Sequence, residues 1–350
     1  MTLLKYHGFE GYDNPVDQEA ANDLITFVGS QEGSAYVAYA TGRNGGKALR
    51  HTGTIFSMYA YLSFPAIAEE AIIGFAFYAD AYPSVDSPLL HMANGTSAIG
   101  SLQITNRSTG ILDIALTQVD PIGRVYFPYN TKQWYYVEAK LRIHDTLGMG
   151  VVRIDEQEIF SLTGQDTRWS SNPTIVATMG LGFPKAVDFR YDDLYIANNE
   201  GSENNDFLGD IRVDQIRPNG AGNYTQLTPS AGANYECVDD VTLDEANYVE
   251  GITAGNKDSY AYANVPTDLD DAGIIGLQIK NNSQRTATAS NIKIDPFIRT
   301  GSTDYSQTAL DLSDAISMVD GDIILDDPSD SNVWTQAKIN ACEFGMEVAS

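Results

Sequence analysis

Acidic and amide side chains crowd one short stretch of the chain. The segment NNEGSENNDFLGD, residues 198–210, contains Glu203, Asp206 and Asp210 together with several Asn residues. Calcium takes about six to eight oxygen ligands, which carboxylates and amide carbonyls supply. The segment lacks the D-x-D-x-D-G-x5-E spacing of the EF-hand loop, so a solvated connector between two strands is the other interpretation. We predict a connector and keep Glu203, Asp206 and Asp210 as candidate calcium ligands; no other cofactor is expected.

A second pattern concerns the cleavage of glycosidic bonds. Retaining glycosidases need two carboxyl groups roughly 5 Å apart, and laminarinase-type enzymes place them in an E-x-D-x-x-E strand. The nearest match here is RIDEQE, with Arg153 where the first carboxylate is needed, followed by Asp155 and Glu158. A guanidinium has no lone pair with which to act as a nucleophile or to accept a proton. We therefore predict no catalytic residues and no enzymatic activity.

Adjacent aspartates occupy one further strand-like segment. Asp192 and Asp193 point to opposite faces of a regular strand, so they cannot share one ion unless the strand bulges. We predict a structural role, in which one of the two carboxylates accepts backbone N–H groups and anchors a turn.

Aromatic residues offer a different chemistry, which is stacking on the apolar face of a sugar ring. Two Tyr-rich segments, YADAYPSVDSP and VYFPYNTKQWYY, supply the candidates Tyr78, Tyr82, Tyr126 and Tyr129. Burial in the core or in a subunit interface is the alternative for each of them.

Composition excludes several function classes. The chain has 350 residues and a formal net charge of −26, which repels nucleic acid phosphates and anionic membranes. No apolar run is long enough to cross a bilayer, and the start MTLLKYHGFEGYDNP has no signal-peptide pattern. We expect synthesis in the cytoplasm and no membrane insertion. Cys237 and Cys342 are the only cysteines, and the sequence leaves open whether they are bonded.

The elements that position these residues are strands. Short runs rich in β-branched and aromatic residues alternate with Gly, Asn, Pro and Asp. In WYYVEAKLRI, residues 134–143, apolar and polar side chains alternate with the period of two of a strand with one buried face. Residues 210–216, DIRVDQI, are predicted to form a return strand. Helices are predicted only in DQEAANDLITFV (17–28) and WTQAKINACEFG (334–345).

The segment RPNGAGNY, residues 217–224, marks a boundary because Pro and Gly recur in it. We predict an all-β protein with a jelly-roll sandwich over residues 1–217. A smaller β-sandwich follows over residues 218–350 and ends in a short helix.

Several motifs of the first domain resemble the concanavalin A-like, laminin-G-like jelly roll. They are W-x-x-V-E at Trp134, V-x-I-D at Val152 and DDLYI at residues 192–196. The start LLKYHGFEGYD, the segment NNDFLGDIRVDQIRPNG and the end VWTQAKINACEFGMEV are similar to parts of bacteriophage virion proteins built on this fold.

The resemblance implies a structural component of a phage particle, either a head decoration protein or a tail or fibre part. Its partners would be other capsid or tail proteins and further copies of itself, with a homotrimer as the first expectation. The alternative is a glycan-binding adhesion module or a glycan-cleaving enzyme acting on cell-surface polysaccharide. A virion protein that binds a host-surface glycan would combine the two.

Overall fold

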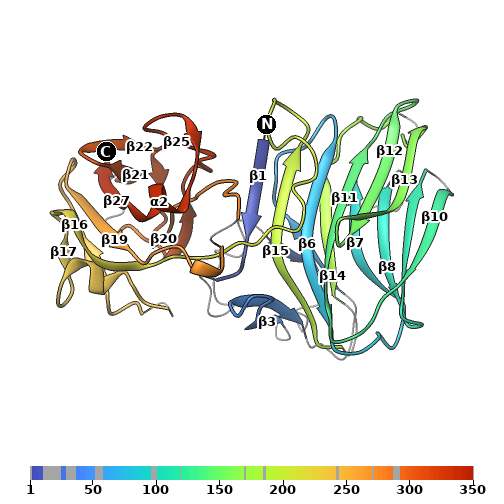
Figure 1. Cartoon of the computed structure of the whole chain (residues 1–350), viewed down its shortest axis with the longest axis horizontal. Helices are drawn as coiled ribbons and strands as arrows, with labels where there is room; N and C mark the ends of the chain where they lie inside the picture. Colours follow the sequence, from blue (N-terminus) through green and yellow to red (C-terminus); the bar gives the residue numbers. More distant parts are fainter. Residues whose placement is uncertain are drawn as a thin grey trace. The chain divides into compact units, whose positions relative to one another are not determined.

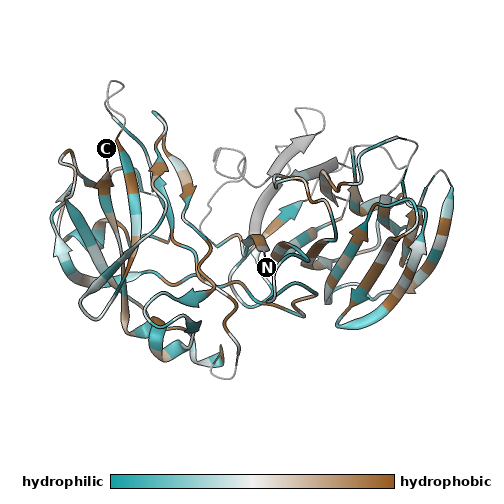
Figure 2. Ribbon diagram, turned by 90° about the horizontal axis from the view of Figure 1, so that it is seen from above, coloured by the Kyte–Doolittle hydropathy of each residue, from teal (hydrophilic) through white to brown (hydrophobic). Residues whose placement is uncertain are grey.

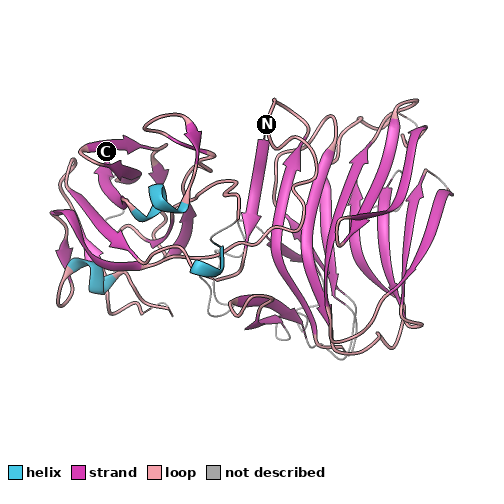
Figure 3. Ribbon diagram, viewed as in Figure 1, coloured by secondary structure: helices cyan, strands magenta, loops and turns pink. Residues whose placement is uncertain are grey.

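The chain forms two separate β-rich units. The computed structural model describes residues 2–10, 25–28, 37–51, 58–95, 101–118, 120–168, 171–183, 187–241, 244–269, 272–286 and 292–349. The units span Met1–Asp214 and Gln215–Ser350, which puts the division three residues before the predicted one. Strands dominate both units (Figures 1 and 3). None of the helices in the described part of the chain has the length and apolar character needed to span a bilayer.

Two antiparallel sheets stack face to face in the first unit (Figure 1). Sheet A contains, in spatial order, β13 (Gln157–Gln165), β12 (Gly148–Ile154), β11 (Trp134–Arg142), β6 (Ala71–Ala79), β15 (Phe189–Asn198), β4 (Lys47–His51) and β3 (Val37–Thr41), and β1 (Thr2–His7) also pairs with β15. Sheet B contains β10 (Pro121–Pro128), β9 (Ile111–Thr117), β8 (Ser101–Arg107), β7 (Ser87–Ala93), β14 (Thr178–Phe183), β5 (Met58–Leu62) and β2 (Ile25–Val28).

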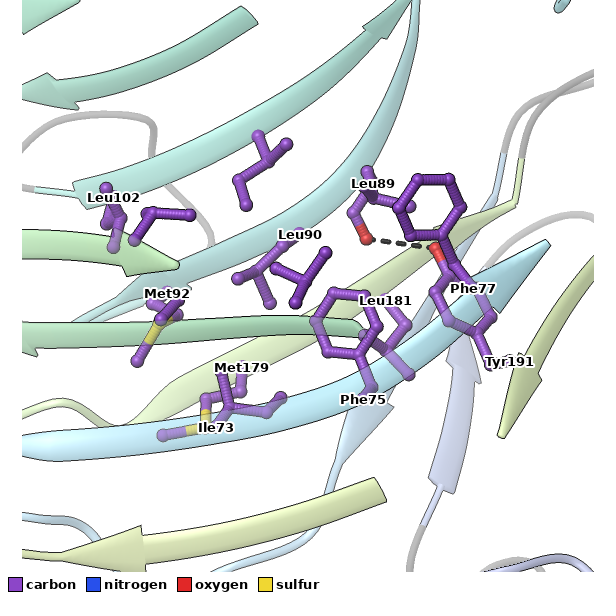
Figure 4. Close-up of a cluster of buried hydrophobic side chains, with 14 of the residues drawn as sticks. Ile73, Phe75, Phe77, Leu89, Leu90, Met92, Leu102, Met179, Leu181 and Tyr191 are labelled. Atoms are coloured by element: carbon purple, nitrogen blue, oxygen red, sulfur yellow. Dashed lines mark hydrogen bonds between the residues drawn. The ribbon is translucent and has the colours of Figure 1, made fainter. Parts of the chain in front are cut away.

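The core lies between these sheets and follows the predicted alternation. Tyr135, Val137, Ala139 and Leu141 of β11 all point into it. Figure 4 shows part of this core, where the Tyr191 hydroxyl donates to the carbonyl of Leu89 at 3.0 Å. Burial of such side chains contributes about 25 cal/mol per Å² of apolar surface. The predicted all-β sandwich is confirmed.

Two local predictions in the first unit need correction. RIDEQE does not form one strand but a hairpin between β12 and β13, because Asp155 and Glu156 adopt positive φ angles of 49° and 65°. The Asp155 carboxylate ties this turn to β11 by accepting the N–H of Tyr136 at 2.8 Å. In the predicted helix over residues 17–28, the described part is strand β2, and the other residues lie outside the described ranges. β-branched Ile25, Thr26 and Val28 favour the strand.

The predicted return strand over residues 210–216 is absent. No helix or strand occurs from residue 199 to residue 217, and the chain there contacts the outer face of sheet A through side chains and single N–H groups. The segment therefore leaves β15 without joining either sheet.

The second unit is built on a six-stranded sheet. Its strands are β16 (Pro218–Thr225), β19 (Lys257–Tyr262), β27 (Cys342–Ala349), β21 (Lys293–Thr300), β22 (Thr303–Ser306) and β23 (Leu310–Asp311). Short pairs accompany it: β17 (Thr228–Pro229) with β18 (Val249–Glu250), β20 (Lys280–Ser283) with β24 (Ser317–Asp320), and β25 (Asp326–Asp327) with β26 (Asn332–Val333). Figure 2 shows hydrophobic and hydrophilic positions interspersed along these strands.

The described part of this unit also contains the short helices η2 (Asn234–Cys237), η3 (Thr267–Leu269) and α2 (Gln336–Asn340). Helix α2 lies within the predicted C-terminal helix. It begins where the Thr335 hydroxyl caps the N–H of Lys338, which is the usual role of Thr at this position. Cys237 and Cys342 are both buried and free.

Candidate functional site

A row of aromatic and basic side chains crosses four strands on the outer face of sheet A. Trp134 of β11 lies opposite Tyr78 of β6, Tyr78 lies opposite Arg190 of β15, and Arg190 lies opposite Arg50 of β4. The rings of Trp134 and Tyr78 are 5.5 Å apart, and the Arg190 guanidinium lies 5.1 Å from the Tyr78 ring. All four side chains are half-buried, so one edge of the row faces solvent.

Asp188 holds the two guanidinium groups of this row in place. Arg190 donates to both oxygens of Asp188 at 3.1 Å, and Arg50 lies 2.8 Å from one of them. Burial would raise the pKa of Asp188, but the hydrogen bonds from Arg190 and Arg50 outweigh it and lower the pKa. The carboxylate is therefore ionised at neutral pH. The row thus offers two rings and a fixed set of charged hydrogen-bonding groups.

The neighbouring rows of the same face are closed to solvent by the connector. The next row contains Tyr136 and Asp192, and the one after it contains Arg153, Glu138, Gly74 and Tyr195. Glu138 is only 1% exposed, although it faces away from the core. Gly74 makes room for the Tyr195 ring, since a Cβ at this position would lie 2.0 Å from a ring carbon.

Residues 205–213 of the connector, which we call the strap, cover these rows. Asp206 pairs with Lys140 at 2.6 Å, and Asp210 pairs with Arg43. The ring of Phe207 lies over Lys140 and Arg153, at 4.6 Å and 4.4 Å.

Backbone groups of the strap also reach the sheet. The N–H of Leu208 donates to the Tyr195 hydroxyl at 3.1 Å, and the N–H of Gly209 donates to Glu138 at 2.9 Å. Further along, the N–H of Val213 donates to Asp193 at 2.8 Å. These bonds explain how a segment without secondary structure stays on the sheet.

Glu138 and Tyr195 form a buried polar pair beneath the strap. The Tyr195 hydroxyl donates to Glu138 Oε1 at 2.5 Å, whereas Glu138 Oε2 is buried without a hydrogen-bond donor. Burial raises the pKa of Glu138 even though the bonds from Tyr195 and Gly209 lower it. Burial and the adjacent Glu138 raise the pKa of Tyr195 well above its ordinary value.

Asp192 and Asp193 both face the outer side because the strand bulges there. The register of β15 shifts between Asp192 and Tyr195, and Asp193 has a φ of 49°. Asp192 accepts the N–H of Arg43 at 2.7 Å, and Asp193 accepts the N–H of Val213. Both carboxylates thus accept backbone N–H groups, where the sequence predicted one.

The candidate calcium ligands do not gather into a cage. Asp206 and Asp210 bind Lys140 and Arg43 instead, and Glu203 is exposed. Within the described ranges, no three His, Cys, Asp or Glu side chains lie close enough to hold one metal ion. Basic partners from β11 and from the β3–β4 turn neutralise the acids of the loop, which the local sequence did not reveal.

The four candidate tyrosines fall in three places. Tyr78 belongs to the aromatic row, and Tyr126 is 57% exposed on the outer face of sheet B. Tyr82 and Tyr129 meet edge to face with ring centroids 5.4 Å apart. The prediction for Tyr129 is wrong, because this side chain is 3% exposed, packs in the core and donates to Asn106 at 2.8 Å.

Near Tyr126 on sheet B, a buried carboxylate pairs with two partly exposed arginines, since the Asp113 side chain is 2% exposed. Asp113 lies between Arg107 and Arg124, and its carboxylate is 3.1 Å from the Arg124 Nε. The side chain of Arg124 is 41% exposed.

Sequence reasoning missed Trp134, Arg190 and Arg50 as site residues. Trp134 was assigned only to the fold motif, and the two arginines lie far from it in sequence. Their common row depends on the register of four strands, which no local pattern fixes. The available signal was that Trp134 is an aromatic residue at a strand position where the alternation predicts a solvent-facing side chain.

No model of a known protein family matches this chain, and no curated protein does. Solved structures with similar folds include the alginate lyase Aly36B, at 10% identity over 56% of this chain and 98% of that one, with a TM-score of 0.43. An endo-β-1,4-glucuronan lyase from Trichoderma reesei has 12% identity over 56% and 95%, with a TM-score of 0.38. A carbohydrate esterase from the Shiga toxin-encoding bacteriophage phi24B has 11% identity over 56% and 97%, with a TM-score of 0.37.

These structures correct one prediction. We predicted a protein without enzymatic activity, and this prediction is contradicted because proteins that share the fold include two polysaccharide lyases and a carbohydrate esterase. The lack of a laminarinase-type pair excludes one mechanism only.

Proposed function

We propose that the first unit recognises a glycan through the row formed by Trp134, Tyr78, Arg190 and Arg50. The observation that carries this proposal is the pair of half-buried rings 5.5 Å apart, with a guanidinium stacked beside them. The two rings are tilted by 46° to each other, so they form an angled apolar surface against which the C–H face of a sugar can pack. The guanidinium groups, fixed by Asp188, present N–H donors to its oxygens.

The row suits a ligand that approaches along the sheet surface. Its side chains are fixed by strand register and by Asp188, so little conformational entropy is lost on binding. A polysaccharide fits this arrangement because it presents repeated apolar faces and hydroxyl groups.

Binding to a glycan array followed by titration calorimetry tests the proposal. We expect Trp134→Ala and Tyr78→Ala each to weaken binding by about tenfold or more, since a stacked ring contributes about 1–3 kcal/mol. Tyr126→Ala is the matched control, because it removes an exposed ring from sheet B. Equal losses in all three variants, or binding to no glycan at all, would contradict the proposal.

Cleavage is measured on the same protein and ligands. New reducing ends would indicate hydrolysis or elimination, and ultraviolet absorbance of an unsaturated product would indicate elimination. The place in a phage particle, the capsid or tail partners and the homotrimer stay predictions. Native mass spectrometry of the purified chain tests the trimer.

A further inference from the structure

We propose that the strap covers a second sugar subsite, which accepts a carboxylate-bearing sugar, and that the strap occupies it as an internal mimic of that ligand. This inference rests on the proposed function, because the covered rows continue along the same face from the aromatic row. A bound acidic glycan would displace residues 205–213 and take over their contacts.

The contacts of the strap define the chemistry of the ligand. Two carboxylates of the strap, Asp206 and Asp210, meet the basic groups of Lys140 and Arg43. The side chains of the two basic residues are only 9% and 14% exposed. Each basic group also has one carboxylate of the sheet nearby, Glu70 at 3.6 Å from Lys140 and Asp193 at 2.9 Å from Arg43. Since the strap supplies the second carboxylate to each, a negatively charged ligand suits the place that the strap occupies.

The ring of Phe207 defines an apolar part of the same subsite. The Lys140 ammonium and the Arg153 guanidinium lie 4.6 Å and 4.4 Å from the centroid of this ring. Below the strap, Tyr195 provides aromatic surface of the sheet itself, and its hydroxyl accepts the N–H of Leu208. The apolar face of a sugar ring can occupy the place of Phe207.

Glu138 supplies an independent observation. Its side chain is 1% exposed, and Oε2 has no hydrogen-bond donor, whereas Oε1 accepts from Tyr195 and Gly209. A buried acceptor without a donor is costly, typically about 1–3 kcal/mol. The strap therefore satisfies this carboxylate only in part. A sugar hydroxyl can donate the hydrogen bond that Glu138 Oε2 lacks.

The strap is attached in a way that allows exchange. It forms no strand ladder with sheet A, and its two acids are 68% and 44% exposed. Exposed ion pairs of this kind contribute little stability each. The net charge of −26 opposes the approach of a polyanion, but physiological salt screens this repulsion beyond roughly 8 Å.

A double variant of the full chain tests the inference. We expect Asp206→Asn with Asp210→Asn to bind a tetrasaccharide of uronic acid about tenfold more tightly than the natural chain in 0.15 M salt, because the internal competitor is weakened. Glu200→Gln with Glu203→Gln is the matched control. It removes two charges from the same connector without touching Lys140 or Arg43. We expect no gain in affinity from this control.

Hydrogen exchange of the natural chain gives a second readout that does not depend on folding of a variant. The uronate tetrasaccharide should speed exchange of the Leu208, Gly209 and Val213 amides, and a neutral tetrasaccharide should not. Unchanged exchange and equal affinity in both double variants would overturn the inference. If neutral glycans still bind and Trp134→Ala abolishes that binding, the proposed function stands while the strap inference fails.

Discussion

The outer faces of sheets A and B carry similar side chains in different surroundings. On sheet A, Glu138 is 1% exposed and Lys140 is buried beneath the strap. On sheet B, the Arg124 side chain is 41% exposed and Tyr126 is 57% exposed. The strands of both faces alternate polar and apolar residues, so the difference comes from a segment remote in sequence that lies on one face only.

The comparison shows what burial does to charge. Beneath the strap, Lys140, Arg43 and Asp193 have lost most of their hydration and depend on their ionic partners. The acids of the strap itself, Asp206 and Asp210, stay exposed. On sheet B, Asp113 is also buried, but it has two arginine partners and keeps one when the other is removed. Equivalent substitutions on the two faces should therefore differ strongly in effect.

Replacing Arg43, which binds Asp210 and Ile211 of the strap, gives the largest expected effect. Arg43→Ala removes the partner of Asp193, at 2.9 Å, and of Asp210, and also the donor to the carbonyl of Ile211 at 2.6 Å. Because Asp193 is 3% exposed, we expect a loss of about 3 kcal/mol in the stability of the first unit. Native-state hydrogen exchange of the β11 amides measures it.

The matched substitution on sheet B is Arg124→Ala. Asp113 is 2% exposed but keeps Arg107 as a partner, and Arg124 is 41% exposed. We therefore expect a smaller loss than for Arg43→Ala, about 1 kcal/mol. Losses of similar size on the two faces would show that the strap does not create the difference.

A smaller effect is expected from Gly74→Ala, which tests packing beneath the strap. The added methyl group would lie 2.0 Å from the Tyr195 ring, so the ring must move away from Glu138. We expect a loss of about 2 kcal/mol and faster exchange of the Leu208 amide, which bonds to the Tyr195 hydroxyl. Gly95→Ala is the control, since no atom lies within 4 Å of its added Cβ.

The sequence predicted much of the fold and little of the site. Period-two patterns revealed β11, and the turn residues revealed the boundary near residue 217, because both signals are local. The strap was missed because Glu138 and Lys140 look like solvent-facing residues on the polar phase of a strand. Only the register of β11, β6 and β15 shows that Lys140, Glu138 and Tyr195 lie under one segment.

For the same reason, the sequence identified only one residue of the aromatic row as a candidate. Tyr78 was selected from a Tyr-rich segment, but Trp134 and Arg190 joined it through pairings across sheet A. Tyr129 was selected by the same rule and is a core residue. Composition identifies residues that are able to stack on sugars, whereas strand register decides which of them face outward together.

The smallest expected effect is on the pH dependence of stability, which has opposite signs for the groups considered on the two faces. Burial, followed by the charge of Asp193, raises the pKa of Asp192 to about 8. Native Asp192 thus holds a proton that the unfolded chain releases near its ordinary pKa of about 4. The resulting stability is fully present below pH ~4 and is lost as the pH rises to about 8.

On sheet B the sign is reversed. Hydrogen bonds from the Ser108 N–H and from the Arg107 side chain lower the pKa of Asp86. The stability that Asp86 contributes is therefore lost only as the pH falls below the ordinary pKa of an aspartate. Between pH 5 and pH 8, the stability of the first unit should therefore fall because of the groups beneath the strap. Asp192→Asn removes one titrating group and should reduce this dependence, which thermal denaturation at the two pH values measures. Asp193 and Glu10 should carry the remainder, because burial raises their pKa values to about 6 and about 7. Asp86→Asn should leave the slope in this window unchanged, and a slope that survives Asp192→Asn in full would show that Asp192 does not titrate in it.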